Sequence, residues 1–266
     1  MFFGDYHTHT VFSHGKGTIL QNVQRAADLG LKEIAITDHG LSHIAFGLNE
    51  DKVIRMRAEI DRIQPLFPDT RILLGVEANL VGLNGTIDVI DDEWEMFDIV
   101  LMGYHKFVWP SMVWDYFKLF AANYLYDTLK TRAPDKLMVR NTDACVEAVM
   151  NNNIDVFTHV NYGFPVDCKE VAAACKEYGT FLEINGKRIS YTDAEFEEMA
   201  ATGVQFIMNS DAHSVGRIMD VEPGLALLRR TGYPLEAVVN YNRRPEFRLE
   251  KFREQMKKTG AAKEAP

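Results

Sequence analysis

The stretch GDYHTHTVFSHGKGT, residues 4–18, holds three of the chain's eight histidines: His7, His9 and His14. It has the pattern of a strand, a loop and then a helix. His7 and His9 end a predicted strand over residues 2–7, and a capping box at Thr18–Gln21 starts a helix that stops at Gly30. Side chains two positions apart on a strand share a face, so both imidazoles point the same way. A metal ion is the acceptor that two such imidazoles would share.

The same order of a strand followed by a helix repeats along the chain. Short, nearly continuous apolar runs are typical of parallel strands covered on both faces. These runs lie at 33–39, 71–80, 98–105, 155–160, 180–185 and 204–213, and the predicted helices include 50–64, 142–151, 167–179 and 192–203. We therefore predict an α/β fold, a seven-stranded (β/α)7 TIM-like barrel, with an open doubly wound sheet as the alternative. Residues 1–258 would form this single domain and 259–266 a short flexible tail.

The composition limits the classes of function. The chain has 266 residues, 47% of them apolar, and a formal net charge of −9. This acidic balance argues against a long nucleic acid as the main partner, because polymer binding needs a broad basic face. We find no signal-peptide pattern, and charges and a proline interrupt the most apolar stretch, residues 107–126. We expect a cytoplasmic protein without membrane attachment, in which Cys145, Cys168 and Cys175 are buried thiols.

An aromatic segment follows the fourth predicted strand. Trp114, Phe117, Ala121 and Tyr124 recur at helical spacing and define one helix face. We expect this face to pack on the barrel or to form a contact between subunits, so that residues 107–126 could support an oligomer. A lid over the site is the functional alternative.

Side chains that bind metals lie at or near the C-terminal ends of the predicted strands. In a parallel barrel these ends share one face, where active sites are built. His14, in the first loop, can join that face, whereas His43 is interpreted as a surface residue or as one that packs beside the ligands without binding metal. We therefore predict a metal centre at this end of the barrel. Its predicted ligands are His7, His9, His14, His39, Glu77, His105, His159, Asp211 and His213.

In chain order these motifs resemble the PHP (polymerase and histidinol phosphatase) family. The motifs are HTH at 7–9, His14, TDHG at 37–40, GVEAN at 75–79, GYH at 103–105, THV at 158–160 and SDAH at 210–213. The resemblance runs from Asp5 to at least His213. The stretch GVEANLVGLNGTID at 75–88 looks closest to the stand-alone phosphatase branch of the family.

The resemblance implies a distorted seven-stranded barrel that holds three divalent metal ions, which zinc, iron or manganese could supply. The implied ligand sets are His7, His9, Glu77 and Asp211 for the first ion, Glu77, His105 and His159 for the second, and His14, His39 and His213 for the third. In this arrangement Glu77 bridges two ions.

The implied activity is hydrolysis of phosphate monoesters of a small metabolite, with histidinol phosphate, nucleotides and sugar phosphates as candidate substrates. A hydroxide that bridges metal ions would attack phosphorus in line, without a separate protein nucleophile. Lys187, Arg188 and Arg217 follow the sixth and seventh strands and are the candidate phosphate-binding residues. A solvated basic loop is the alternative interpretation of these three cations.

Three other functions stay open. One is a phosphodiesterase or an exonuclease on short oligonucleotides, and another is an amidohydrolase-type metal hydrolase. Amidohydrolases share the barrel and the opening HxH motif, but they generally use a carboxylated lysine where this chain has Glu77. The third is a non-catalytic metal-binding protein, which would be expected to have lost some of the ligands.

Overall fold

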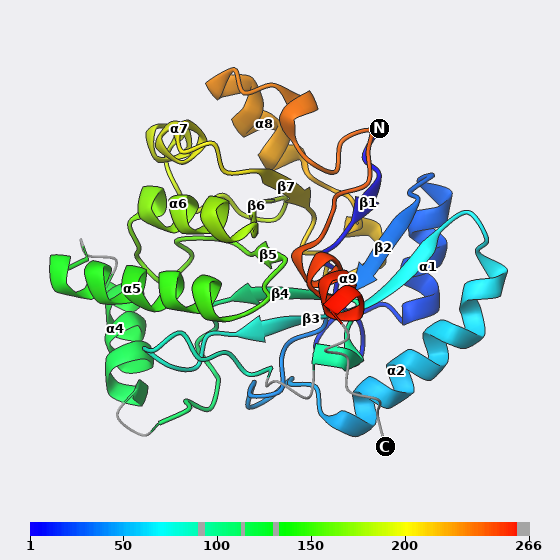
Figure 1. Ribbon diagram of the computed structural model, residues 1–266, viewed down its shortest axis with the longest axis horizontal. Coiled ribbons are helices and arrows are strands. Elements are labelled where there is room, and N and C mark those ends of the chain that lie inside the picture. Colours follow the sequence, from blue (N-terminus) through cyan, green and yellow to red (C-terminus); the bar gives the residue numbers. More distant parts are fainter. Residues whose placement is uncertain (90–93, 113–114, 130–132, 260–266) are drawn as a thin grey trace.

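The computed structural model describes residues 1–89, 94–112, 115–129 and 133–259 (Figure 1). Seven parallel strands pair in chain order, each with the next. They are β1 Gly4–Asp5, β2 Glu33–Ile36, β3 Arg71–Asn79, β4 Ile99–Gly103, β5 Val156–Phe157, β6 Phe181–Asn185 and β7 Phe206–Asn209. The predicted α/β fold with a seven-stranded barrel is therefore confirmed.

The barrel closes just beyond the ends of β1 and β7. Thr8 and Ala212 form a parallel bridge, in which the amide of His9 donates to the carbonyl of Ala212 over 2.8 Å. The amide of Ala212 in turn donates to the carbonyl of His7 over 3.2 Å. This closure joins the first predicted metal-binding motif of the chain to the last one.

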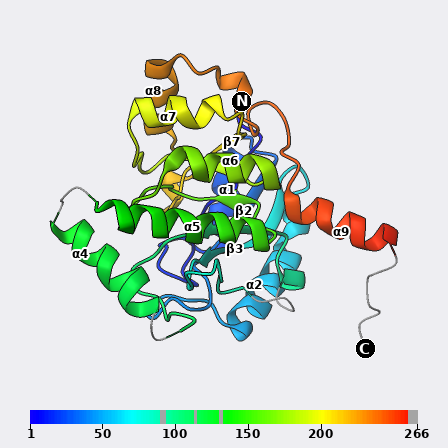
Figure 2. The same cartoon turned by 60° about the vertical axis from the view of Figure 1, so that its left-hand side comes forward.

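Helices surround the strands on the outside of the barrel (Figures 1 and 2). They are α1 Ile19–Asp28, α2 Glu50–Ile63, α4 Ala122–Leu129, α5 Asp135–Asn151, α6 Cys168–Tyr178, α7 Asp193–Ala201, α8 Glu222–Thr231 and α9 Arg248–Thr259. The capping boxes predicted at Thr18 and Thr192 are both present, since each threonine hydroxyl accepts from the amide three residues on and each threonine amide donates to the side chain of that same residue, Gln21 or Glu195.

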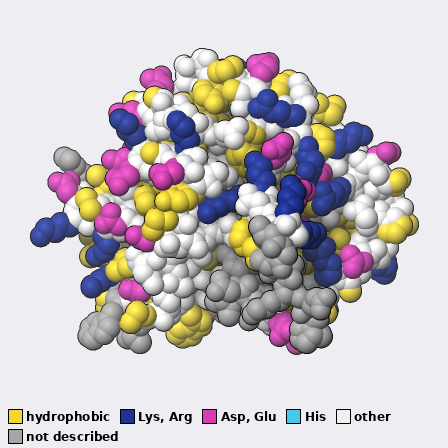
Figure 3. Space-filling model, viewed as in Figure 1, with side chains coloured by type: hydrophobic (Ala, Val, Ile, Leu, Met, Phe, Trp, Pro, Cys, Tyr) yellow, Lys and Arg dark blue, Asp and Glu magenta, His cyan; other side chains and the backbone are white. Residues whose placement is uncertain are grey.

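Two apolar cores hold these layers together. The larger one lies between the strands and the outer helices, and the smaller one fills the barrel with Tyr6, Leu73, Leu101 and Phe247 among its members. α9 covers the N-terminal end of the barrel, because the amide of Leu249 donates to Oδ1 of Asp155, the residue before β5. Figure 3 shows lysine and arginine side chains gathered around α9 and, among the described residues, no histidine on this face.

The predicted start of the helix before β5 needs correction. α5 starts at Asp135, right after Pro134, and not near Thr142. Threonine is typical of helix starts, but Thr142 lies in the interior of α5. There its hydroxyl donates a hydrogen bond to the carbonyl of Met138, one turn earlier in the helix.

The aromatic segment also differs from the prediction. Phe117, Ala121 and Tyr124 face solvent, and Trp114 lies outside the described residues. Leu119, Phe120 and Asn123 are buried instead. Residues Tyr116–Ala121 form a π-helical turn, whose wider winding shifts the buried face away from the one that a 3.6-residue period predicts. Packing of the predicted face on the barrel is therefore wrong, and a subunit contact through it stays a prediction.

The three cysteines are buried and free, as predicted. Among the described residues, no helix is long and apolar enough to cross a membrane. The predicted tail, residues 259–266, begins at the last residue of α9, and 260–266 lie outside the described residues.

Candidate metal centre

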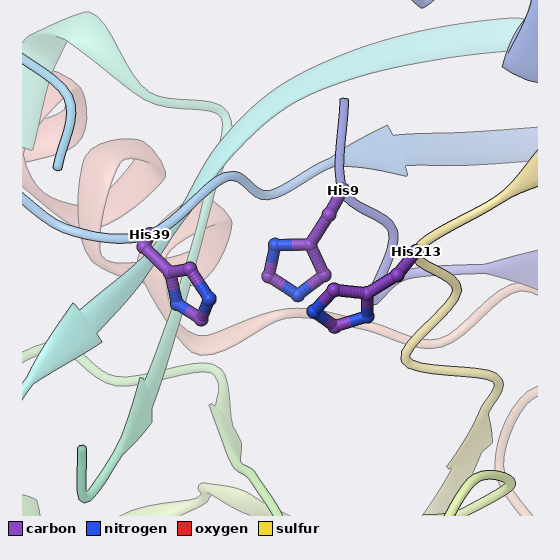
Figure 4. Close-up of side chains that lie close together, drawn as sticks. All are labelled: His9, His39 and His213. Carbon is purple, nitrogen blue, oxygen red and sulfur yellow. The ribbon is translucent and has the colours of Figure 1, made fainter. Parts of the chain in front are cut away.

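The nine predicted ligands come together at the C-terminal end of the barrel. His7 and His9 follow β1, Glu77 lies near the end of β3, and Asp211 follows β7. Figure 4 shows the rings of His9, His39 and His213, which reach the same space from three separate segments. The ring centres of His9 and His213 are 4.2 Å apart, and those of His9 and His39 are 4.6 Å apart. The barrel thus gathers residues that are more than 200 positions apart in the sequence.

Glu77 is the central carboxylate of this cluster. Its side chain is buried, and nitrogen atoms of five imidazoles lie within 4 Å of its two oxygens. The shortest contact is 2.8 Å, between Nε2 of His159 and Oε1. Nδ1 of His39 lies 2.9 Å from Oε2, on the other side of the carboxylate. A carboxylate with imidazoles around both oxygens has the geometry needed to bridge two cations.

Three groups of side chains have ligand atoms close enough to share an ion, with all atoms of a group within 4.8 Å of one another. The groups are His7 with His9 and Asp211, His39 with Glu77 and His105, and His9 with His39 and His213. His14 stacks on His39 with ring centres 4.7 Å apart and an angle of 3° between the planes. The geometry therefore places His39 between the second and third implied ligand sets.

Several buried polar atoms of the cluster have no hydrogen-bond partner. They are Nδ1 of His9, Nδ1 of His39 and Oε2 of Glu77, of which the last two lie 2.9 Å apart without the alignment that a hydrogen bond needs. A buried polar atom without a partner costs about 1–3 kcal/mol, so three in one place need an explanation. Imidazole nitrogen and carboxylate oxygen are ligands for zinc, iron and manganese. The side chains therefore fit a bound metal ion.

Burial keeps three of the predicted imidazole ligands neutral, which is the form that binds metals. It lowers the pKa of His9 to about 3 and that of His14 to about 4, and it lowers the pKa of His39 well below its usual value. His7 differs from these three. Burial opposes its charge, but Glu183, Glu77 and Asp211 together raise its pKa well above its usual value. The same three carboxylates would also favour a bound cation.

Sequence reasoning missed an outer layer of polar residues that orient the ligands. Nδ1 of His7 donates to Oε1 of Glu183 over 2.8 Å, and Nδ1 of His105 donates to Oδ1 of Asn79 over 2.7 Å. Asp88 in turn accepts from the amide and the side chain of Asn79. Such contacts leave the other nitrogen of each ring free for a ligand. Glu183 and Asn79 sit in the strands β6 and β3, and only their polarity within apolar runs could have drawn attention to them.

Asp38 orders the loop that carries His14. This buried carboxylate accepts hydrogen bonds from the amide of Thr10, over 2.7 Å, and from the hydroxyls of Thr10 and Ser13. The bonds hold the turn at residues 10–15 against the end of β2. Asp38 is part of the TDHG motif at 37–40, but the sequence alone did not indicate this role.

Of the two interpretations of His43, the structure agrees with a residue that packs beside the predicted ligands and not with a surface residue away from them. Its ring stacks on that of His39 with centres 5.1 Å apart, and it lines the same cavity as the predicted metal ligands. The amide of Phe46 donates to Nδ1 of His43 over 3.1 Å, which fixes the ring. Burial lowers the pKa of His43 to about 4, so this imidazole is neutral as well.

A cavity of about 300 Å³ lies beside the predicted ligands, and both cations and aromatic rings line it. Lys106, Lys187 and Arg188 contribute positive charge, and Lys106 is paired with Asp127. The guanidinium carbon of Arg188 lies 3.9 Å from the centre of the Tyr162 ring, a cation–π contact. No carboxylate among the described residues pairs with Arg188.

Arg217 stays outside the cavity. It lies in the 3-10 turn Val215–Arg217, where it pairs with Asp220, and it is not among the lining residues. Of the three predicted phosphate-binding cations, the fold thus brings Lys187 and Arg188 to the candidate centre and leaves Arg217 aside.

Two of the predicted ligands have a strained backbone. His159 has φ 29° and Asp211 has φ 50°, a region that residues with a side chain rarely adopt. The amide of His159 donates to Oε2 of Glu183 over 3.0 Å, which helps to hold this conformation. Strain of this kind is common where a fold positions reactive side chains.

The PHP domain family model matches residues 5–187 of the chain. The chain belongs to the PHP domain family. The match begins just before the HTH motif and ends at Lys187, one of the cations that line the cavity, so it covers most of the barrel. The family resemblance expected from the motifs is confirmed.

Relatives at the level of the whole chain agree with this assignment. A "probable phosphatase" of Shewanella sp. (strain MR-4) is 28% identical over 246 residues, which cover 89% of this chain and 86% of the relative. A "probable phosphatase" of Caldanaerobacter subterraneus subsp. tengcongensis is 30% identical over 251 residues, with the same coverage.

Among solved structures, the PHP protein is similar to a histidinol phosphate phosphatase from Lactococcus lactis, solved with zinc, L-histidinol and phosphate. The TM-score is 0.57 at 19% sequence identity, covering 87% of this chain and 94% of the other. At this identity the likeness concerns the fold.

Proposed function

We propose that this PHP protein is a metal-dependent phosphatase that hydrolyses phosphate monoesters. The observation that carries the proposal is the position of Glu77, whose two oxygens are surrounded by imidazoles beside a cavity that also holds Lys187 and Arg188. Cation ligands and anion-binding side chains thus face the same space. The names of the relatives, and the zinc and phosphate of the Lactococcus lactis structure, support the same class of reaction.

The nine ligands would hold three divalent ions in the sets that the family resemblance implies. Zinc, iron and manganese all suit these nitrogen and oxygen atoms. When bound, such ions lower the pKa of a water molecule, so that hydroxide is available near neutral pH, and they neutralise charge on a phosphoryl group during in-line displacement. Glu183 and Asn79 orient His7 and His105 for this role.

Arg188 and Lys187 would bind the phosphate oxygens. Oδ1 of Asn185 accepts the amide hydrogens of both residues over 2.9 Å, which fixes the loop that presents them. The Tyr162 ring supports the guanidinium of Arg188, and a guanidinium can hold two phosphate oxygens at once. Nζ of Lys187 lies 3.4 Å from Asp211, next to the proposed ligands. These cations explain how a chain of charge −9 would attract an anionic substrate.

Phosphate release from a panel of substrates tests the proposal. The panel holds histidinol phosphate, nucleoside monophosphates, sugar phosphates and a phosphodiester, and the full chain is assayed with its metal content measured. We expect monoester hydrolysis that a chelator abolishes and that added metal restores. Glu77→Gln should abolish it, whereas Glu197→Gln, on the exposed side of α7, should not. Activity on the diester alone, or none at full metal occupancy, would contradict the proposal.

A further inference from the structure

Part of the cavity wall is aromatic and lies next to the cations. Phe46, Phe107 and Tyr162 all line the cavity that contains the candidate metal centre. The Phe46 ring lies 5.1 Å from the ring of His14 and 5.4 Å from that of His43, measured between centres. Contact with these rings would favour a substrate that carries an apolar group, because removing apolar surface from water is favourable.

This wall continues onto the surface through a short antiparallel pairing. His43 and Val108 form a β-bridge, the amide of Ile44 donates to the carbonyl of Phe107, and the amide of Trp109 donates to the carbonyl of Ser42, both over 2.9 Å. Residues directly opposite each other in such a pair present their side chains on the same face. Ile44 therefore lies beside Phe107, and Trp109 lies on that face as well.

Phe46, which lines the cavity, and the three apolar side chains on this face are exposed to solvent. The exposed fraction is 53% for Ile44, 43% for Phe46, 61% for Phe107 and 66% for Trp109. We call these four residues the apolar rim. Exposed apolar groups that gather beside a binding cavity, with a fixed backbone beneath them, mark a surface that a ligand covers.

The charges and the rim together orient a ligand. A phosphate group held by Arg188 and Lys187 and facing Glu77 leaves the rest of the molecule to pass along Phe46 and Phe107. From these residues we infer, on the basis of the proposed function, that the substrate is a phosphate monoester of an apolar alcohol, whose hydrocarbon part lies on the apolar rim. The rim then selects the alcohol and the metal centre selects the phosphate.

A series of n-alkyl phosphates, from methyl to octyl, tests this inference. Their alcohols leave with nearly the same intrinsic difficulty, so a change of kcat/KM with chain length reports contact between the chain and the protein. Burial of one methylene is worth about 0.8 kcal/mol, which corresponds to about a fourfold change. We expect kcat/KM to rise by about two- to fourfold per methylene, because the rim covers one side of the chain. All assays stay below the concentration at which the esters form micelles.

Two variants separate contact with the rim from a general defect. Phe107→Ala should reduce the ratio of octyl to methyl phosphate kcat/KM by about tenfold or more, and Phe107→Leu should recover part of that ratio. Phe252→Ala removes a half-exposed phenyl ring from α9, at the other end of the barrel, and should leave the ratio unchanged. Ratios are compared because they do not depend on the fraction of active protein.

The outcomes distinguish this inference from the proposed function. Equal kcat/KM along the whole series would overturn the inference and leave the phosphatase proposal intact. A flat series together with a change of oligomeric state in Phe107→Ala would assign the rim to a second copy of the chain, and would also overturn it. No phosphate release from any member, at full metal content, would contradict both.

Discussion

Nδ1 of His7 lies 2.8 Å from Oε1 of Glu183, and both side chains are fully buried. Since a carboxylate only accepts, the hydrogen sits on Nδ1, and Nε2 faces Glu77 at 3.2 Å. Glu183 also accepts from Asn209, Asn185 and the amide of His159. Glu183 is not one of the nine proposed ligands, yet it aligns the first metal-binding motif with the residues that follow β5.

This relationship predicts that Glu183→Gln weakens metal binding without removing a ligand. The amide group of glutamine would bring hydrogens toward the donors that the carboxylate now accepts from, so the His7 ring would lose its fixed orientation. We expect the metal affinity to fall by about 10- to 100-fold. Titration with a competing chelator measures it. Glu177→Gln, on the exposed side of α6, is the control, and an unchanged affinity in Glu183→Gln would show that Glu183 does not orient His7 for metal binding.

Arg188→Ala is predicted to impair substrate binding with the metals retained. A hydrogen bond to a charged group contributes about 1.5–3 kcal/mol, so KM for a phosphate monoester should rise by about 10- to 100-fold. Arg217→Ala removes an arginine that pairs with Asp220 outside the cavity and should leave KM within about twofold. Steady-state kinetics and metal analysis of both variants check this. Equal KM values in wild type and Arg188→Ala would show that Arg188 does not bind the phosphate and would support the alternative interpretation, a solvated basic loop.

The dependence of stability on pH should contain a contribution from Asp155. Burial raises the pKa of this carboxyl to about 7, while its oxygens accept from the amides of Val100 and Leu249. The folded state therefore holds this proton more tightly than the unfolded chain, where the pKa is 3.8. Its contribution is fully present below pH 3.8 and is lost as the pH rises through 7.

The size of this contribution follows from the shift. Loss of this contribution between about pH 5 and about pH 7.5 should lower the free energy of unfolding by about 2.5 kcal/mol. Asp155→Asn should lack this pH dependence. The difference in the free energy of unfolding between wild type and variant therefore isolates the contribution of Asp155, because the histidines titrate in both proteins. Urea unfolding at several pH values, at one metal concentration, measures that difference. A difference that does not vary with pH would show that Asp155 does not titrate in this range.

Much of the fold follows from local patterns. The apolar runs located all seven strands, and the capping boxes at Thr18 and Thr192 located the starts of two helices, because these signals depend on a few adjacent residues. The ends of parallel strands meet at one face whatever the details of packing, which is why nine candidate ligands could be named from the chain alone. The family match later covered the same residues up to Lys187.

Other features depend on contacts that no local pattern records. The π-helical turn at Tyr116–Ala121 changes which side of the segment is buried, and a fixed helical period misses such a change. His43 joins the cavity only because residues 42–44 pair with 107–109. Glu183 and Asp88 stand in the sequence as single acids in apolar surroundings. Their roles become visible only once the donors around them are known.

The metal content and turnover of His105→Ala, measured beside those of the wild type, test the central claim most directly. His105 lies 3.4 Å from Glu77 and, in the proposed assignment, belongs to the set that shares Glu77 with the first ion. We predict about three metal equivalents per chain in the wild type, about one fewer in the variant, and loss of more than about 99% of monoester turnover. Full metal content with near-normal turnover in His105→Ala would contradict the assignment of Glu77 as a bridge between two catalytic ions.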